Sequence, residues 1–301
     1  MKIVLLGKNG QVGWELQRAL QPLGDVIALD RQIDNNGLCG DITNFTAIEQ
    51  LYATIKPDVV INAAGYTAVD NAEIDQQQAD LVNHLAVKNL AEMSKKYESL
   101  LVNYSTDYVF DGNKNTPWLE TDNTAPINYY GKTKREGELA LEQSGVKFIN
   151  FRTSWVYGSH GNNFIKTMLK LAQSKTELNI IADQIGAPTG SALIADVTAQ
   201  ALRYYFLNKQ PSTLHGHYHL VASGTCSWFE YAQFIFATAE KEMGTKLLLE
   251  QVNPIPTSEY PTPAKRPLNS RLNTQKLQTQ FQLHLPHWQQ GVAQVLGELL
   301  L

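Results

Sequence analysis

The sequence predicts an α/β fold built on a doubly wound parallel sheet, followed by a smaller mixed α/β domain. Three observations point to it. Short apolar runs recur along the first half of the chain, amphipathic helical stretches separate them, and a glycine-rich turn follows the first run. Near-continuous apolar strands are typical of a parallel sheet covered on both faces, and right-handed crossovers then produce the doubly wound arrangement.

The expected strands are rich in Val, Ile and Leu. They are Ile3–Leu6, Val26–Leu29, Val59–Ile61, Leu100–Val102 and Phe148–Phe151. We expect one more strand region shortly before Asp41. A long helix is expected over Ala79–Tyr97, where Leu and Ala recur at helical spacing and lysines near the end suit the negative pole of a helix.

The pattern loosens after about residue 152 into loops such as 158–164 and 183–190 and a proline-rich stretch at 253–267. We therefore expect a first domain over residues 1–155 and a smaller one over 156–301. Because Leu193–Leu207 again has the pattern of an amphipathic helix, the chain is expected to return to the first domain over about 187–212. The second domain would then be discontinuous.

Composition narrows the possible functions. A hydrophobic share of 43% with 18% charged residues fits a compact globular protein, and a net charge of −4 without a basic patch argues against nucleic-acid binding. Cys39 and Cys226 lack the spacing of a metal or disulfide framework, which suits a reducing, cytoplasmic environment. Glycines interrupt the first apolar run, so we expect a strand there and no membrane association.

The glycine-rich turn predicts a dinucleotide site. Gly7, Gly10 and Gly13 form a GxxGxxG pattern between the first strand and a helix expected over Val12–Leu20. Glycines there let the backbone approach a pyrophosphate, whose charge meets the exposed N–H groups at the helix N-terminus. An ordinary glycine turn would explain the motif alone. Its position predicts that residues 1–155 form a Rossmann-type domain.

The ends of later strands add cofactor candidates. Asp30 ends the second strand, where a carboxylate accepts hydrogen bonds from the adenosine ribose and favours NADH. Arg31 could pair with a 2′-phosphate, which leaves NADPH open, or could be a solvated side chain. Small or polar residues at two further strand ends would leave room for adenosine and pyrophosphate. These are Asp41, Ile42, Ala63, Ala64 and Gly65.

A tyrosine and a lysine at helical spacing suggest acid–base chemistry. Tyr130 and Lys134 lie on one face of a helix, and a nearby ammonium lowers the pKa of a phenol. An exposed tyrosine beside a solvated lysine would also explain this pair. Thr106 follows the strand around Leu100–Tyr104 at the carboxyl edge of the sheet, where it could hydrogen-bond a substrate carbonyl oxygen.

Taken in order, these features resemble the extended short-chain dehydrogenases, and longer stretches are similar to the dTDP-4-dehydrorhamnose reductase family. The stretches include GKNGQVGWELQRAL, TAVDNAE, NYSTDYVFDG, YYGKTKREGE, FRTSWVYG, GNNFIKTML, DQIGAPTG, YPTPAKRPLNSRLN and PHWQQGV. The resemblance implies NAD(P)H-dependent reduction of the C4 keto group of dTDP-4-dehydro-β-L-rhamnose to dTDP-β-L-rhamnose. This would be the last step in making that nucleotide sugar.

The resemblance also implies residue roles. Thr106 and Tyr130 would polarise the carbonyl, Tyr130 would deliver the proton, and Lys134 would lower its pKa. Asp107 and Trp155 would join Thr106 in contacting the sugar. Implied cofactor contacts are Gly10, Gln11, Val12, Asp30, Asp41, Ile42, Gly65, Tyr66, Thr67 and Tyr104. From its own chemistry, Arg266 in the proline-bounded loop could clamp a diphosphate or form a structural ion pair.

The chain departs from the family at a metal site. Some members dimerise through a metal held by three glutamates, and only Glu15 matches, with Ala192 and Gln289 at the other positions. Without those carboxylates we expect no such metal, and a monomer or weak homodimer.

Other conspicuous residues are expected to be structural. His215, His217 and His219 alternate as strand residues could for metal binding, but no carboxylate or thiolate lies nearby in sequence, so edge-strand histidines are favoured. The tryptophans Trp118, Trp228 and Trp288 are expected in the core or an interface.

Two alternative functions stay open. A nucleotide-sugar epimerase or dehydratase shares the fold and the Tyr-x-x-x-Lys pair but returns the hydride, so net redox change separates it from a reductase. A non-catalytic regulatory subunit is a different class, of which that of methionine adenosyltransferase is an example. The presence of Thr106, Tyr130 and Lys134 argues against that second class.

Overall fold

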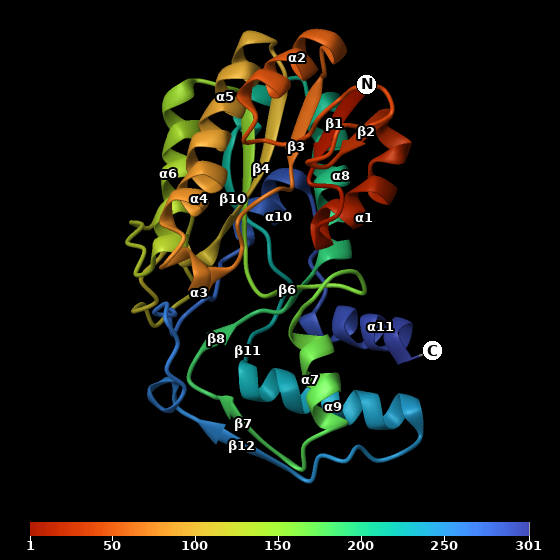
Figure 1. Cartoon of the computed structure of the whole chain (residues 1–301), viewed down its shortest axis with the longest axis vertical. Coiled ribbons are helices and arrows are strands. Elements are labelled where there is room, and N and C mark those ends of the chain that lie inside the picture. The colour runs from red at the N-terminus through yellow and green to blue at the C-terminus, as the bar shows by residue number, and fades with distance from the viewer. Residues whose placement is uncertain (301) are drawn as a thin grey trace.

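A six-stranded, all-parallel sheet forms the upper part of the molecule in Figure 1. The structure is a computed structural model and describes residues 1–300. The strand order is β10-β5-β4-β3-β1-β2. Their bounds are β1 Lys2–Leu6, β2 Asp25–Leu29, β3 Val59–Asn62, β4 Leu100–Thr106, β5 Phe148–Thr153 and β10 Gly216–His219. The five expected strands and the doubly wound α/β fold are confirmed, and the histidine-rich stretch supplies the sixth strand.

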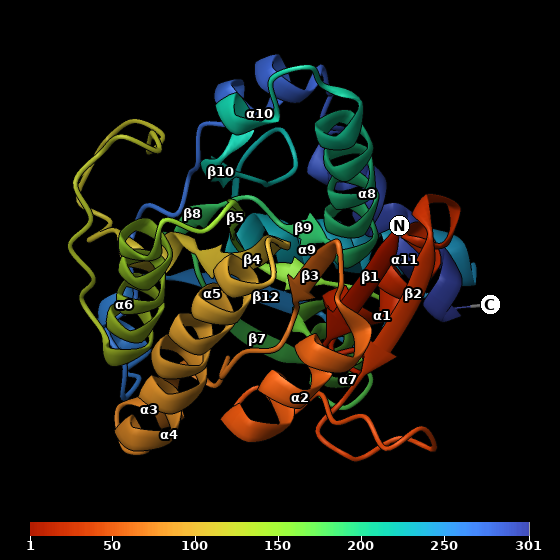
Figure 2. The same cartoon turned by 90° about the horizontal axis from the view of Figure 1, so that it is seen from above.

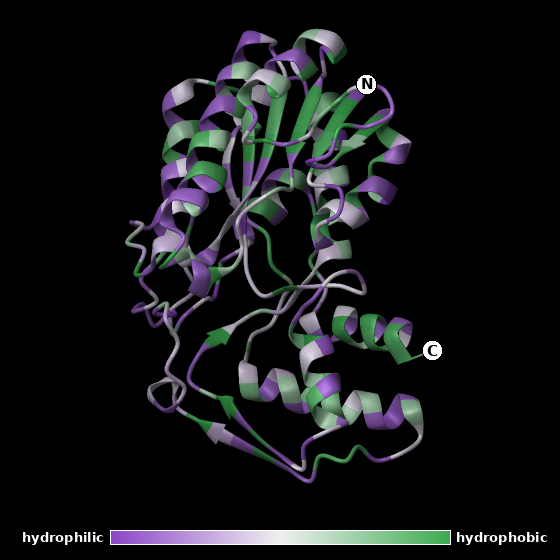
Figure 3. Cartoon of the chain, in the orientation of Figure 1, coloured by the Kyte–Doolittle hydropathy of each residue, from purple (hydrophilic) through white to green (hydrophobic). Residues whose placement is uncertain are grey.

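Helices cover both faces of this sheet, as the view from above in Figure 2 shows. One face carries α1, Gln11–Ala19, α8, Ser191–Leu207, and α10, Gln275–Phe281. The other carries α2, Phe45–Ile55, α5, Ala86–Lys96, and α6, Tyr129–Ser144. The strands are mostly green in Figure 3 because their side chains are apolar on both faces. This double burial explains the continuous apolar runs in the sequence.

The long helix expected over Ala79–Tyr97 is interrupted. It starts as α4, Gln76–Asp80, passes through a π-helical stretch at Leu81–Leu85, and continues as α5. The π-helical stretch holds Asn83, which is buried and bonds both main-chain groups of Tyr66. Such stretches recur at functional sites because they redirect a side chain out of helical register.

The strand expected before Asp41 is wrong. That segment contains only an isolated bridge between Ile33 and Cys39, and polar turn chemistry explains why. The Asp34 carboxylate accepts hydrogen bonds from the backbone of Asn36 and Leu38, closing a loop in place of a strand. As a result Thr106 belongs to the fourth strand in the chain, and β4 extends through it.

The lower part of Figure 1 is a small mixed α/β layer. Two-stranded pairings join β7, Glu177–Ile181, to β12, Gln251–Ile255, and β8, Ile185–Gly186, to β11, Cys226–Ser227, while β6, Val156–Tyr157, pairs with β9, Thr189–Gly190. Helices α7, Phe164–Ala172, α9, Trp228–Met243, and α11, Trp288–Leu300, enclose its core. The exact domain limits stay a prediction.

Short helices complete the order of elements. They are α3 Val69–Ala72 and the 3-10 turns Gln21–Leu23, Asp107–Val109, Pro211–Leu214 and Thr257–Glu259. Among residues 1–300, no helix has both the length and the apolar character needed to cross a membrane.

Candidate active site

The glycine turn between β1 and α1 is shaped by backbone contact. Gly7 has φ +85°, and a Cβ there would lie 2.6 Å from the Ala64 nitrogen. A Cβ at Gly13 would lie 2.1 Å from the Gly7 oxygen. No side chain caps the start of α1 at Gly10, which leaves the N–H groups of Gln11 and Val12 for an anion. The turn therefore fits a pyrophosphate.

Asp30 lies beside this turn as an ionised acceptor. Its carboxylate accepts hydrogen bonds from the Gln32 N–H and the Asn9 amide, each at 2.8 Å, and Lys8 Nζ lies 3.6 Å away. These contacts, the Gln32 N–H first, lower the pKa of Asp30. The positive charge of Lys8 offsets the negative charge of the Asp30 carboxylate, and Arg31 is exposed next to it. The surface around Asp30 is therefore compatible with a ribose hydroxyl or a 2′-phosphate.

The other predicted cofactor positions lie at the carboxyl edge of the sheet, except for Ile42, whose side chain lies in the core. Ala63, Ala64 and Gly65 follow β3 at the carboxyl edge, and Tyr66 and Thr67 continue this edge. Asp41 accepts hydrogen bonds from the backbone and hydroxyl of Thr43, whereas the Ile42 side chain is buried in the core cluster over α2. A cofactor contact at Ile42 would therefore have to come from its backbone.

Thr106 and Tyr130 are brought together at the carboxyl end of β4. The Tyr130 phenol lies next to the Thr106 hydroxyl, although α6, which carries Tyr130, begins far along the chain. The Asn128 side chain caps α6 by accepting from the Gly131 N–H at 2.7 Å, so the phenol comes from the first turn of a fixed helix. Burial raises the pKa of Tyr130, and the Thr106 hydroxyl opposes that rise.

Lys134 lies one turn further along α6 and is buried. Its Nζ donates to the Tyr104 carbonyl at 2.6 Å and would lie 3.8 Å from a Cβ at Gly65. Burial lowers the pKa of Lys134 to about 8, against the raising effect of the Glu138 charge. The ammonium thus joins Tyr104 and Gly65, two of the predicted cofactor positions.

Asp107 adds a buried carboxyl group to this corner, where it accepts a hydrogen bond from the Thr106 hydroxyl at 3.2 Å. Burial raises the pKa of Asp107 to about 7, while the Ser270 and Thr106 hydroxyls oppose the rise. Among residues 1–300, no side chain or backbone group partners Asp107 Oδ2. Ser270 has no sequence signal of its own and reaches the site only because its segment folds back onto β8.

Arg266 is held by groups of the protein. Its guanidinium donates to the Asp70 carboxylate at 2.7 Å and to the Tyr108 hydroxyl at 3.2 Å, and Asp70 also accepts from the Ala264 N–H. The Tyr108 ring packs edge-on against Tyr130, with centroids 5.8 Å apart. Arg266 therefore does form an ion pair, which lies next to the catalytic corner.

A ladder of polar side chains beneath the site was missed by sequence reasoning. Asn62, Asn103, Asn150 and His217 are in register on four neighbouring strands. Their side chains bond in turn at 2.9, 2.8 and 2.9 Å. The signal was present, since Asn interrupts or ends the apolar runs VVIN, LLVN and FIN.

Asn150 of this ladder also donates to Glu138 at 3.3 Å, and Glu138 belongs to a buried ion pair. Glu138 accepts two hydrogen bonds from Arg152, at 2.8 and 2.7 Å, and both residues are almost wholly buried. Every buried charge here has a partner, which is the condition under which such a pair is tolerated.

The three histidines each bond a protein group, and only His217 and His219 lie in β10, since His215 precedes it. His215 pairs with the Tyr205 hydroxyl at 2.9 Å, His217 with Asn150, and His219 Nδ1 with the Asn273 carbonyl at 3.1 Å. Within residues 1–300, no group of three or more His, Cys, Asp or Glu side chains has metal-site geometry. Glu15 pairs with Arg18 at 3.6 Å, and it lines a hollow of about 430 Å³ together with Ala192, whereas Gln289 lies outside that lining.

The tryptophans differ in environment. Trp118 is buried and stacks on Phe110 at 4.5 Å, and Trp288 is buried against Tyr231 and Phe234. Trp228 is only half-buried and stacks on Trp155.

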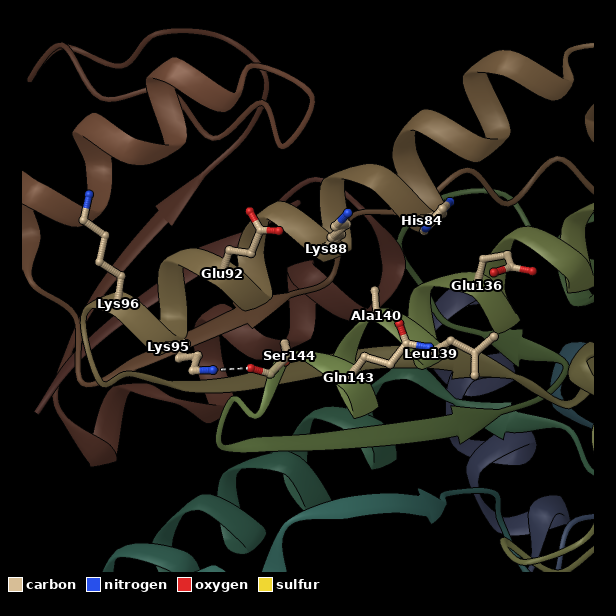
Figure 4. Close-up of a pocket in the computed structure, with 10 residues that line it drawn as sticks. All are labelled: His84, Lys88, Glu92, Lys95, Lys96, Glu136, Leu139, Ala140, Gln143 and Ser144. Carbon is tan, nitrogen blue, oxygen red and sulfur yellow. Dashed lines mark hydrogen bonds between the residues drawn. The ribbon is translucent and has the colours of Figure 1, made fainter.

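A hollow of about 580 Å³ between α5 and α6, drawn in Figure 4, lies apart from the catalytic residues. Its lining mixes Lys88, Lys95 and Lys96 with Glu92 and Glu136, and Lys95 donates to the Ser144 carbonyl. This is a solvated seam between two amphipathic helices.

The parallel sheet, the uncapped glycine turn and the Thr106–Tyr130–Lys134 corner define an extended short-chain dehydrogenase type of dinucleotide-binding protein. The sequence model of the RmlD substrate binding domain matches residues 1–301, and the chain belongs to the dTDP-4-dehydrorhamnose reductase family.

Individual relatives agree with this assignment over nearly their full length. The chain is 52% identical to the dTDP-4-dehydrorhamnose reductase of Escherichia coli K12, over 99% of this chain and 98% of that protein, and 44% identical to that of Burkholderia thailandensis, over 100% and 99%. It is similar to the Bacillus anthracis reductase solved in complex with NADP, with TM-score 0.88, 35% identity and 99% of both chains covered. A Thermus thermophilus UDP-glucose 4-epimerase, 19% identical with TM-score 0.78 over 99% of both chains, shares the fold.

Proposed function

We propose that this protein reduces the C4 carbonyl of dTDP-4-dehydro-β-L-rhamnose to the alcohol of dTDP-β-L-rhamnose, using NADPH or NADH. The observation that carries the proposal is the meeting of Thr106, Tyr130 and Lys134 at the carboxyl end of β4. The names of the relatives support the substrate, and the NADP complex of the Bacillus anthracis relative supports the cofactor.

The residues of the chain divide the work. When bound, the reduced nicotinamide supplies a hydride to the C4 carbon. Thr106 and Tyr130 hydrogen-bond the carbonyl oxygen, and Tyr130 transfers its proton to that oxygen as negative charge develops there. The Lys134 ammonium stabilises the resulting tyrosinate, which then takes a proton from solvent.

The remaining predicted contacts orient the two ligands. The α1 N-terminus and Asp30 would hold the pyrophosphate and adenosine ribose, with Lys8 and Arg31 near a 2′-phosphate. Asp107 and Trp155 would contact the sugar, and Arg266 would turn one of its donors to the diphosphate. Free Cys39 and Cys226 support a reducing cytoplasm, and the absence of Glu at positions 192 and 289 supports a monomer or weak homodimer.

The test is NADPH and NADH oxidation, followed at the nicotinamide absorbance, with enzymatically prepared dTDP-4-dehydrorhamnose. Stoichiometric loss of reduced cofactor with dTDP-rhamnose formed is the expected result. Conversion of a nucleotide sugar without net cofactor loss would favour an epimerase instead. Tight cofactor binding without any turnover would favour a regulatory subunit.

A further inference from the structure

Trp155 is held in a conformation that bulky residues rarely adopt. It lies at a bend two residues beyond Thr153, which pairs with Thr106 across β5 and β4, and its φ is +48°. A left-handed backbone at a non-glycine residue costs about 1–3 kcal/mol and persists only where surrounding contacts enforce it. The contacts that enforce it therefore carry information about what the residue does.

Two elements of the small layer enclose its indole. The ring stacks on Trp228 with centroids 3.7 Å apart and planes 17° from parallel. On β8, a Cβ at Gly186 would lie 2.7 Å from Trp155 Cε2, so only glycine leaves room for the ring. The Trp155 carbonyl accepts from the Thr189 N–H at 3.2 Å. The ring thus occupies a slot built by β8 and by the first residue of α9.

Trp228 is itself fixed at the edge of that slot. It begins α9 directly after a capping box formed by Ser227 and Glu230. Its Nε1 donates to Gln184 Oε1 at 3.1 Å, and the Gln184 amide donates to the Thr257 hydroxyl at 3.1 Å. Trp228 is thus a partly buried aromatic whose polar group is satisfied and whose ring faces Trp155, unlike the buried Trp118 and Trp288.

The slot around Trp155 and the site around Thr106 are connected through the backbone of β8. Ile185 donates to the Leu268 carbonyl and accepts from the Ser270 N–H, each at 2.8 Å. Ser270 in turn lies beside Asp107, the neighbour of Thr106. Figure 1 shows β8 and β11 side by side below the sheet, with α9 following β11. A shift of the slot would therefore change the position of the Trp155 ring relative to Thr106.

We propose that Trp228 is a positioning residue for the sugar, acting by stacking on one face of Trp155 and so fixing where the other parts of that ring meet the pyranose. Gly186 serves the same purpose from β8 by leaving space for the indole. This inference rests on the proposed function, because it assigns Trp228 to the sugar end of that site. It adds a ligand-positioning role to the core packing expected of Trp228.

The test compares Trp228→Leu, Trp228→Phe and Gly186→Ala with Phe164→Leu. Phe164 is a matched control, since it packs on Trp228 with centroids 4.7 Å apart and has no stacking contact with Trp155 among residues 1–300. The measurements are KM and kcat for dTDP-4-dehydrorhamnose, the Kd of NADPH, and the circular-dichroism couplet of the stacked indoles. Gly186→Ala perturbs Trp155 with Trp228 intact, which keeps the test valid should Trp228→Leu fold poorly.

We expect Trp228→Leu and Gly186→Ala to raise KM about tenfold, with a smaller loss of kcat and an unchanged Kd for NADPH. Trp228→Phe should retain much of the affinity because it keeps an aromatic face. The couplet should vanish in Trp228→Leu and persist in Phe164→Leu, whose KM should stay near that of the wild type.

An active wild type whose KM is unchanged in both Trp228→Leu and Gly186→Ala would overturn the assignment of Trp228 alone. An equal rise of KM in Phe164→Leu would also overturn it, since general packing would then explain the effect. A wild type that oxidises no cofactor would instead contradict the proposed function, and the Trp228 assignment with it.

Discussion

The Nζ of Lys134 donates a hydrogen bond to the main-chain carbonyl of Tyr104 at 2.6 Å, and both groups are buried. This contact ties the first turns of α6 to the end of β4, two residues before Thr106. Among residues 1–300, no hydrogen bond joins Lys134 directly to the Tyr130 phenol. The backbone of the neighbouring strand sets the position of the lysine, and we expect the lysine to act on Tyr130 through its charge.

Tyr130→Phe should reduce kcat by roughly 10²–10⁴-fold, because it removes the proton donor but keeps the ring that packs against Tyr108. The Kd of NADPH, measured by fluorescence titration, should change little. A variant with near-normal turnover would rule out Tyr130 as the donor. Tyr129→Phe is the matched control, since Tyr129 has Thr133 at the spacing where Tyr130 has Lys134.

Activity should fall as the pH rises through about 8. The lowered pKa of Lys134 means that the free protein loses this ammonium near that pH, and kcat/KM reports groups of the free protein. Lys134→Met should abolish most of the activity at every pH. A wild-type kcat/KM that is flat from pH 7 to 10 would contradict the role of the Lys134 charge.

The same group predicts a stability difference. Because the folded pKa of Lys134 lies below its unfolded value, the unfolded state binds more protons between about pH 8 and 10.5. The free energy of unfolding of the wild type, measured in urea relative to Lys134→Met, should therefore rise across that window. A constant difference would show that Lys134 is not desolvated.

Asp107→Asn should stabilise the protein more at pH 8 than at pH 5. The folded pKa of Asp107, about 7, exceeds its ordinary value of 3.8, so the wild type loses stability as the pH rises between those values. Between pH 5 and pH 8 the change is at most about 3 kcal/mol, since only the two pH units from 5 to the folded pKa contribute, each at about 1.4 kcal/mol. Urea unfolding of both proteins at the two pH values measures it, and an equal difference at both would contradict the raised pKa.

Arg266→Lys and Asp70→Asn separate a ligand role from a structural one. Arg266→Lys keeps a cation opposite Asp70 but removes the guanidinium fork that suits a diphosphate, whereas Asp70→Asn removes the ion pair and keeps the fork. We expect Arg266→Lys to raise the KM of the nucleotide sugar about tenfold, and Asp70→Asn to raise it less. Equal KM changes, matched by equal losses of thermal stability, would indicate a structural ion pair only.

Arg152→Met should destabilise the protein by about 3 kcal/mol, because it removes two hydrogen bonds to the buried Glu138 carboxylate and leaves Arg135, at 3.0 Å, as its cationic partner. Burial alone would raise the pKa of Glu138, but the charge and hydrogen bonds of Arg152 hold it at about 2, so the pair's contribution is lost as the pH falls from 4.5 towards 2. The double variant Glu138→Gln with Arg152→Met should recover part of the stability in urea unfolding. A double variant no more stable than Arg152→Met would show that the two side chains are not coupled.

Local patterns in the sequence determined five strands of the large sheet, four of its helical regions and the site motifs. Apolar runs of three or four residues are enough to define strands of a buried sheet, and Gly7 and Gly13 occupy turn positions that leave no room for a Cβ. The spacing of Tyr130 and Lys134 places them on one helix face wherever the helix lies. These features depend on neighbours along the chain, so the sequence carries them directly.

The tertiary structure decided the contacts between segments far apart in the chain. Ser270 on Asp107, Asp70 on Arg266 and Trp228 on Trp155 depend on how loops of the small layer fold back onto the sheet. The Asn62–Asn103–Asn150 ladder depends on strand register, and the π-helical turn at Asn83 on its bonds to Tyr66. No local pattern encodes such pairings, because each side chain finds its partner only when packing brings the two segments within hydrogen-bonding or stacking distance.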